Sequence, residues 1–314
     1  MPDDPGGGTD AGTTSHHVLF VNSAAPAGDL IECPRLLPIQ HLFDDWLTDA
    51  QAAHLAHATG TPRGPITGHR MLDRELGGML STGDHLVHGG PGVGKTAFGL
   101  QVASASPFPC LYLTAEMRPL ELFRRVTARV TGTYLGRLKT GELQPEDSLA
   151  LARRAAESAP RLVFADATRA WAPPDWILEV ARLIKGDAPH MLLVVDSVHS
   201  WVEGMPGNVD EYTALNAGLG ALRRVAQELT CPVLAIAERN RLSMKDGGLS
   251  AAAGSRRFEY GAESVLSLSR EDKSVVDATG EVPVTLTIEK NRHGAPGKRI
   301  KMTFNGALQR FTEV

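Results

Sequence analysis

The sequence of 314 residues has little of what defines several protein classes. Its three cysteines, Cys33, Cys110 and Cys231, form no C-x-x-C pair, which favours reduced thiols over disulfides or a zinc site. No apolar run approaches the roughly 20 residues that span a bilayer. Residues 1–5 lack the basic start and apolar stretch of a signal peptide. These absences, together with 42% apolar and 22% charged residues, predict an ordinary globular protein of the cytoplasm.

The net charge of −4 is distributed unevenly. Residues 1–60 contain eight Asp or Glu and one Arg, whereas residues 285–314 contain six Lys or Arg and two Glu. The basic end permits nucleic-acid binding, but a solvated charged surface explains it equally well. Charge alone does not select a partner.

Composition divides the chain into three parts. We expect residues 1–37 to form a disordered or extended arm, because the segment 1–16 is rich in Gly, Asp, Thr and Pro. Residues 38–66 are expected to form a linker region. It begins with an amphipathic helix from Pro38 to Ala56 and continues into a segment rich in Pro and Gly, Thr61–Pro65. Residues 67–314 remain for one larger domain.

In this larger domain, short apolar runs alternate with helical patterns. Strands are predicted at Leu86–His88, Cys110–Thr114, Leu162–Ala165, Met191–Asp196, Val233–Ala237, Ser264–Ser269, Val284–Glu289 and Ile300–Phe304. Helices are predicted at Thr96–Ser104, Pro119–Val130, Pro145–Ser158, Pro174–Lys185 and Tyr212–Leu229. The alternation predicts an α/β fold with a doubly wound, mainly parallel sheet covered on both faces. The last three strands have no helices between them and predict an antiparallel C-terminal extension, with the turn Gly294–Gly297 joining the final pair.

Residues 89–96 read Gly-Gly-Pro-Gly-Val-Gly-Lys-Thr, a complete G-x-x-x-x-G-K-[ST] phosphate loop. Such a loop lets successive N–H groups point at phosphate oxygens, while Lys95 reaches the β- and γ-phosphates and Thr96 binds Mg²⁺. The predicted strand before the loop and helix after it place phosphate at a helix N-terminus. The chain has no N-K-x-D guanine reader, so ATP is the expected nucleotide. The predicted nucleotide-binding residues are Gly89, Gly90, Pro91, Gly92, Val93, Gly94, Lys95, Thr96 and Ala97.

Two predicted strands of this domain end at or next to a carboxylate. Asp196 follows an apolar run about a hundred residues after the loop and could bind the Mg²⁺ shell beside Thr96, although apolar runs ending in Asp are common. Glu116 follows another strand and could polarise the attacking water as general base. The alternative for Glu116 is a helix N-terminus, where the macrodipole favours a carboxylate anyway.

From Thr67 to Val314 the sequence resembles the RecA-type motor domain of the DnaB replicative helicases. The segment Thr67–Asp73 resembles the family's T-G-x-x-x-L-D lead-in, and Leu111–Met117 resembles its strand ending in E-M. Leu138–Leu143, followed by Glu146 and Asp147, resembles L-R-T-G-x-L-x-x-E-D. The resemblance implies that Glu116 is the catalytic base.

Two further stretches are more similar to RadA, the bacterial recombination ATPase. Val195-Asp196-Ser197-Val198 resembles its I-D-S-I, where DnaB has D-Y-L-Q. Residues 290–294 resemble its K-N-R-F-G, and the DnaB counterpart K-x-R-N-G shares Lys290 and Arg292. The resemblance implies that these cations reach the γ-phosphate held by a neighbouring subunit and accelerate hydrolysis by about 10³ or more. The residues alone fit equally a pair of cations solvating a hairpin end.

One position departs from the DnaB pattern, and one loop carries the DNA prediction. Where DnaB-like proteins carry Q-x-N-R, whose Gln senses the γ-phosphate, this chain has Glu238, a carboxylate that repels phosphate unless a cation or Mg²⁺ faces it. The Gly-, Ser- and Ala-rich loop after it is basic and suits phosphate contact, but a surface loop without a ligand fits too. Its candidate DNA-binding residues are Arg241, Lys245, Arg256 and Arg257.

The resemblance implies an ATP- and Mg²⁺-dependent ring motor, expected to be a homohexamer, that acts as helicase or translocase on single-stranded DNA in replication or recombination. The alternative is an ATPase switch or assembly protein similar to RadA or KaiC that binds a protein partner. The modest basic charge, Glu238 and the lack of the accessory domains seen in DnaB and RadA favour this alternative.

Overall fold

The structure is a computed structural model that describes residues 36–207, 209–238, 261–270 and 280–314. The chain splits into two compact units, Met1–Thr59 and Gly60–Val314. In the first unit, a 3-10 helix η1 (Ile39–Leu42) leads directly into helix α1 (Phe43–Thr59), so the predicted helix is confirmed and continues to Thr59. Within the described part of its own unit, no side chain of α1 is buried.

The second unit is built on a nine-stranded sheet in the order β3-β2-β4-β5-β1-β6-β7-β8-β9. Strands β1 to β6 are parallel to one another, and β7, β8 and β9 continue the sheet in antiparallel pairing. The mainly parallel sheet with an antiparallel C-terminal extension is therefore confirmed. The strands are β1 (Gly83–Gly89), β2 (Cys110–Thr114), β3 (Leu162–Asp166), β4 (Leu192–Asp196), β5 (Pro232–Glu238), β6 (Ser264–Arg270), β7 (Glu281–Asn291), β8 (Arg299–Asn305) and β9 (Arg310–Glu313).

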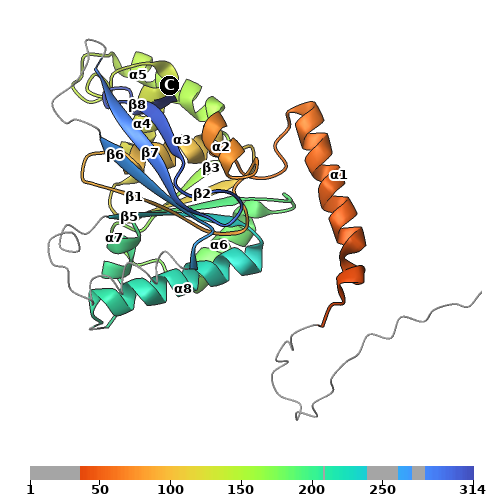
Figure 1. Cartoon of the computed structure of the whole chain (residues 1–314). Helices are drawn as coiled ribbons and strands as arrows, with labels where there is room; N and C mark the ends of the chain where they lie inside the picture. The colour runs from red at the N-terminus through yellow and green to blue at the C-terminus, as the bar shows by residue number, and fades with distance from the viewer. Residues whose placement is uncertain (1–35, 208, 239–260, 271–279) are drawn as a thin grey trace, which may run out of the picture. The chain divides into compact units, whose positions relative to one another are not determined.

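Helices cover both faces of this sheet (Figure 1). On one face lie α3 (Lys95–Ala105), α4 (Pro119–Thr131) and α5 (Pro145–Ser158), and on the other α6 (Pro174–Lys185), α7 (Val198–Glu203) and α8 (Glu211–Leu229). Each face has its own apolar core: Phe98 and Leu122 belong to the first, Trp201 and Leu222 to the second. The central strands β2 and β4 are buried at every position, which explains their continuous apolar runs. Across the described parts of the chain, none of the helices has the length and apolarity that a bilayer crossing demands.

The lead-in to the sheet is a closed turn. The Thr67 N–H and hydroxyl both donate to Asp73 Oδ1 at 2.7 Å, and the Gly68 N–H donates to Oδ2 at 3.1 Å. Asp73 lies in the short helix α2 (Arg70–Glu75), so its carboxylate ties the turn to the helix. Gly68 has φ +76° and its Cα faces Ala105 of α3, where a side chain would collide at 2.5 Å. These contacts explain the T-G-x-x-x-L-D pattern physically.

Three elements were not predicted. Helices α2 and α7 have six residues each, too few for a 3.6-residue period to repeat. Strand β9 carries only Phe311 as an apolar residue among Arg310, Thr312 and Glu313. The turn Gly294–Gly297 does join β7 to β8, but the prediction that these form the final pair is wrong, because β9 pairs with β8 beyond them.

Candidate nucleotide-binding site

The phosphate loop lies between the end of β1 and the start of α3. Gly92 and Gly94 adopt φ +71° and +99°, values that L-residues rarely reach without strain. A Cβ at Gly94 would also lie 2.9 Å from Phe311 and 3.0 Å from Phe304, because β8 and β9 pack behind the loop. The glycine positions of the motif are therefore required by backbone conformation and by packing.

The Lys95 side chain hydrogen bonds back to the start of this loop. Its Nζ donates to the carbonyl of Gly89 at 2.9 Å and to that of Gly90 at 3.3 Å. The ammonium is thus held over the concave side of the loop, next to the N–H groups at the start of α3. A cation and a helix N-terminus at one place fit an oxyanion.

Beside the loop, β4 ends at Asp196, which is buried. Its carboxylate accepts a hydrogen bond from the Tyr112 hydroxyl at 2.6 Å to Oδ2. Burial raises the pKa of Asp196, and the hydroxyls of Tyr112 and Thr96 act against that rise, which places Thr96 near the carboxylate. A hydroxyl and a carboxylate near each other supply hard oxygen donors that fit Mg²⁺, so the residues present fit the expected metal.

Glu116 lies in the turn after β2 and is exposed. The turn is fixed by two hydrogen bonds: the Ala115 N–H donates to the carbonyl of Asp196 at 2.9 Å, and the Thr114 hydroxyl donates to that of Met117 at 2.5 Å. Thr114 pairs in register with Asp196. The structure thus brings Glu116 to the sheet edge that holds Asp196.

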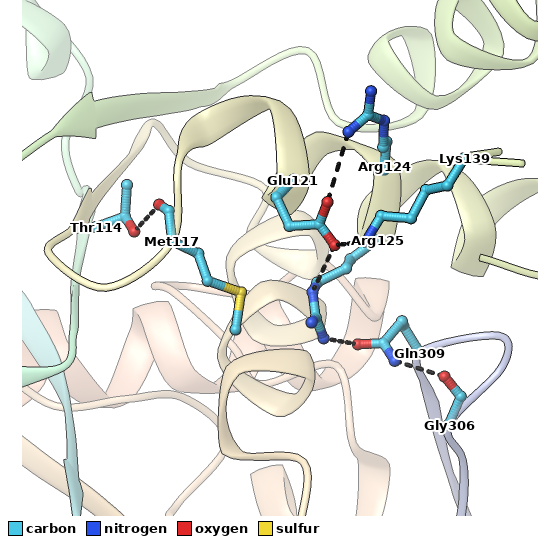
Figure 2. A network of polar contacts seen from close by, with 8 residues as sticks. All are labelled: Thr114, Met117, Glu121, Arg124, Arg125, Lys139, Gly306 and Gln309. Atoms are coloured by element: carbon cyan, nitrogen blue, oxygen red, sulfur yellow. Dashed lines mark hydrogen bonds and ion pairs between the residues drawn. The ribbon is translucent and has the colours of Figure 1, made fainter. Parts of the chain in front are cut away.

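The helix after this turn is anchored by a network of polar contacts, shown in Figure 2. The Glu121 carboxylate of α4 lies 2.5 Å from Lys139 Nζ, 3.6 Å from Arg124 and 3.9 Å from Arg125. Arg125 also donates to the side chain of Gln309, at 2.5 Å, in the turn between β8 and β9. The segment around Lys139 and the antiparallel extension therefore both hold α4, whose first turn follows Glu116.

Glu238 ends β5 directly opposite the first loop glycine, since Gly89 pairs with it in register. Its side chain is exposed, and its N–H donates to His199 Nδ1 at 3.3 Å. His199 therefore accepts at Nδ1, and burial lowers the pKa of its ring. The carboxylate that replaces the family glutamine thus stands at the loop with a histidine beside it.

Lys290 and Arg292 are not brought to this edge. They lie at the end of β7, where Lys290 pairs with Val265 near the start of β6. The neighbouring Ser264 pairs with His85, four residues and about 13 Å before Gly89 along β1. Arg292 Nη1 donates to Glu263 Oε1 at 2.9 Å, so the chain's own Glu263 holds the guanidinium on the side of the sheet away from the loop.

Sequence reasoning missed several residues at the site. Arg270 ends β6 and donates from Nη2 to the loop carbonyl of Gly92 at 2.6 Å. Tyr112 hydrogen bonds to Asp196, and His199 accepts a hydrogen bond from the backbone of Glu238. Only the strand order could have indicated these residues, because each lies in, or shortly after, a parallel strand that ends at the edge of the loop. The candidate DNA-binding residues Arg241, Lys245, Arg256 and Arg257 and the arm 1–35 lie outside the described residues.

The comparisons with known proteins place the chain in a family. The sequence profile of the DnaB-like helicase C terminal domain matches residues 64–313. The chain belongs to this family. The replicative DNA helicase DnaB of Buchnera aphidicola subsp. Schizaphis graminum is 23% identical over 283 residues, which cover 87% of this chain and 60% of that protein. The chain spans only about three fifths of the length of such curated DnaB relatives.

Solved structures show the same RecA-like fold. A DnaB-like replicative helicase, reported with its interactions with primase, superposes with a TM-score of 0.69 at 20% identity and covers 86% of this chain and 66% of its own. A KaiC-like protein from Pyrococcus horikoshii OT3 superposes with a TM-score of 0.55 at 18% identity, over 80% and 99% of the two chains. The predicted DnaB-like P-loop ATPase fold is confirmed, and the range matched by the DnaB-like family includes the loop, Glu116, Asp196 and Arg292.

Proposed function

We propose that this DnaB-like chain is an ATP-hydrolysing motor that acts on single-stranded DNA as a ring, expected to be a hexamer. The position of Asp196 carries the proposal, because this buried carboxylate ends β4 at the same sheet edge at which the phosphate loop follows β1. ATP would lie on the loop, with Lys95 and Thr96 on phosphate and metal. Mg²⁺, when bound, would neutralise phosphate charge there.

Glu116 would orient and activate the attacking water, because its turn is fixed to the carbonyl of Asp196. Lys290 and Arg292 would act on the nucleotide of a neighbouring subunit. They lie at the end of the strands opposite the loop of their own chain, which supports a role in trans. A role in trans would make hydrolysis depend on assembly.

The alternative function, a switch ATPase that binds a protein partner, is not favoured. The modest basic charge and Glu238 favoured this alternative in the sequence, whereas the family match is to helicase domains. The likeness to a KaiC-like structure is one of fold alone.

The proposal is tested by ATP hydrolysis with and without single-stranded DNA at two salt concentrations. We expect stimulation by DNA that weakens between 50 and 200 mM salt, typical ionic strengths for such assays. Lys95→Ala should abolish hydrolysis. Replacing Arg256 and Arg257 with Ala should remove the stimulation, spare basal hydrolysis and reduce the salt slope by about 0.7 per lost phosphate contact.

A matched control replaces Arg153 and Arg154 with Ala, since this adjacent pair is exposed on α5. It changes the net charge equally and should leave stimulation intact. Native protein without DNA-stimulated hydrolysis even at the lower salt concentration would refute the DNA motor, and unchanged turnover of Lys95→Ala would refute the nucleotide site.

A further inference from the structure

A tyrosine hydroxyl lies buried in the middle of the sheet. Tyr112 is the third residue of β2, its side chain has no exposed surface, and it belongs to the core beneath α3 and α4. On the same face of the sheet, Leu192 and Val194 of the adjacent strand β4 are equally buried but purely apolar. Packing alone therefore does not call for a hydroxyl at this position, and a buried phenol needs a hydrogen-bond partner.

The partner is the carboxylate of Asp196. The Tyr112 hydroxyl donates to Oδ2 at 2.6 Å, and Asp196 is itself only 3% exposed. The two residues lie on adjacent strands: β2 pairs with β4 so that Tyr112 faces Val194, two residues before Asp196. The hydroxyl thus reaches along the sheet toward the loop.

The ring is fixed on both sides. Phe164 of β3 packs edge-on against it with the ring centroids 5.7 Å apart. On the side of α3, Gly99 leaves the necessary space: a Cβ there would lie 3.5 Å from the tyrosine oxygen and 2.5 Å from Ile236 Cδ1. A side chain packed in this way holds its hydroxyl at one place.

Two hydroxyls of different origin therefore face Asp196. Thr96 comes from the loop and acts on the carboxylate, and Tyr112 comes from the neighbouring strand and donates a hydrogen bond to it. The first would contact metal in the proposed function, whereas the second lies inside the core and cannot. Groups that orient a metal-binding carboxylate in this way typically change metal affinity by 10–100-fold when removed.

We propose that Tyr112 is a positioning residue for divalent metal: its hydroxyl fixes the Asp196 carboxylate in the orientation that, with Thr96, binds the metal of the metal–nucleotide complex. This inference rests on the proposed function of Asp196. It assigns a property of the nucleotide site to a core residue that touches neither nucleotide nor metal.

The test compares nucleotide affinity with and without metal. Binding of a fluorescent ADP analogue to Tyr112→Phe is measured in EDTA and across a Mg²⁺ titration. Affinity without metal should stay within about twofold of the native value, because Lys95 and the loop are intact. The Mg²⁺ concentration giving half the maximal enhancement should rise by about tenfold.

Thr127→Val is the matched control. It removes another buried hydroxyl, which donates to the carbonyl of Phe123 in its own helix. Its Mg²⁺ dependence should equal that of the native protein. If Tyr112→Phe does not fold, Tyr112→Met is measured in the same way, since methionine fills irregular space and has no hydroxyl.

Asp196→Ala separates the two hypotheses. It should raise the Mg²⁺ requirement at least as much, and adding Tyr112→Phe to it should cause no further change. An unchanged Mg²⁺ requirement in Tyr112→Phe, or an equal loss with and without metal, would overturn the inference while leaving the proposed function standing. An unchanged requirement in Asp196→Ala would instead overturn the metal role of Asp196.

Discussion

Two histidines of the core unit, His69 and His85, are buried. His85 Nε2 lies 2.8 Å from the carbonyl of Ser81, which can only accept, so this nitrogen carries the proton and Nδ1 accepts from Ser264 at 2.8 Å. His69 stacks on Phe98 with the ring centroids 5.2 Å apart. Burial lowers the pKa of each histidine to about 4. Both are therefore neutral in the folded protein at neutral pH.

These lowered pKa values predict acid sensitivity. The unfolded chain binds protons at its histidines below about pH 6.5 while the folded protein does not, so the free energy of unfolding should fall between about pH 6.5 and pH 4. Each histidine contributes at most about 3 kcal/mol at pH 4. Asp84 opposes this loss, because burial raises its pKa to about 6 and the folded state binds its proton first. Urea unfolding at several pH values measures the net change.

Variants at single histidines identify which residue causes the loss of stability at acid pH. His69→Leu should remove up to half of the histidine-linked loss of stability at little cost, since Nε2 of His69 is buried and has no hydrogen-bond partner among the described residues. His54→Leu is the control, because His54 is exposed on α1. Equal pH dependence in native protein and His69→Leu would refute the assignment.

Glu116 gives a prediction on chemistry rather than stability. Glu116→Gln should bind ATP with native affinity and lose hydrolysis by about 10²–10⁴, because the amide cannot accept a proton from water. Steady-state hydrolysis and nucleotide titration measure the two effects, with the exposed Glu157→Gln of α5 as control. A variant that no longer binds ATP would make Glu116 a structural residue.

At the scale of elements, α1 presents apolar side chains that no described residue of its own unit buries. Phe43, Trp46 and Leu47 are 66%, 79% and 56% exposed. They follow helical spacing, so they share one stripe, whereas Leu55 lies nine residues after Trp46, about 180° around the helix. Such a stripe is what an assembly element needs.

We therefore expect α1 to support assembly. Removing residues 1–60 should lower the assembly state at micromolar concentration without changing the thermal stability of the core unit, because no α1 side chain is buried. Trp46→Ala should weaken assembly and Leu55→Ala, similarly exposed at 63%, should not. Sedimentation velocity measures both. A truncated protein that sediments as the same oligomer would exclude α1 from assembly.

The elements that the sequence predicts well are those with a repeated signal. Helices α5 and α6 begin and end where predicted, because each starts at a proline in the first turn and carries several apolar residues at helical spacing. Strand β2 is matched residue for residue because all five of its side chains are buried. Strand β9 offered only Phe311, whose side chain is buried against Phe304 of the paired strand β8 and against Phe98 of the distant helix α3.

The residues of the candidate site also fall into two groups, those that a local sequence pattern predicts and those that depend on the order of the strands. The glycines and Lys95 follow from a local pattern, and Asp196 and Glu116 from strand ends. Tyr112 and Arg270 depend on which strands are neighbours, β2 beside β4 and β6 beside β1, and no local pattern contains that order. The sheet order had to be seen before their roles could be inferred.

At the scale of the whole molecule, the loop and the Lys290–Arg292 pair lie at opposite ends of the strands of one sheet. This arrangement predicts that ATP hydrolysis needs residues from two subunits. Arg292→Ala should bind ATP normally yet lose hydrolysis by about 10³. Mixing it with Lys95→Ala should restore some hydrolysis, at interfaces where an intact loop meets an intact arginine. Arg299→Ala, exposed on β8, is the control and should stay active. No recovery in mixtures shown to exchange subunits would contradict a role in trans.

Hydrogen bonds join the C-terminal strand of the core unit to a helix near the start of that unit. The Glu313 carboxylate accepts the N–H groups of Met71 at 2.9 Å and Leu72 at 3.2 Å, so β9 closes onto the first turn of α2. Because the two ends lie together, we expect the fold to tolerate a different order of its strands along the chain. A circular permutant that joins residue 314 to the lead-in through a short linker, with new termini at the exposed turn after α6, should retain the same nine-stranded sheet. Such a permutant would free the lead-in from α1 and allow the motor to be attached to other proteins at a new point.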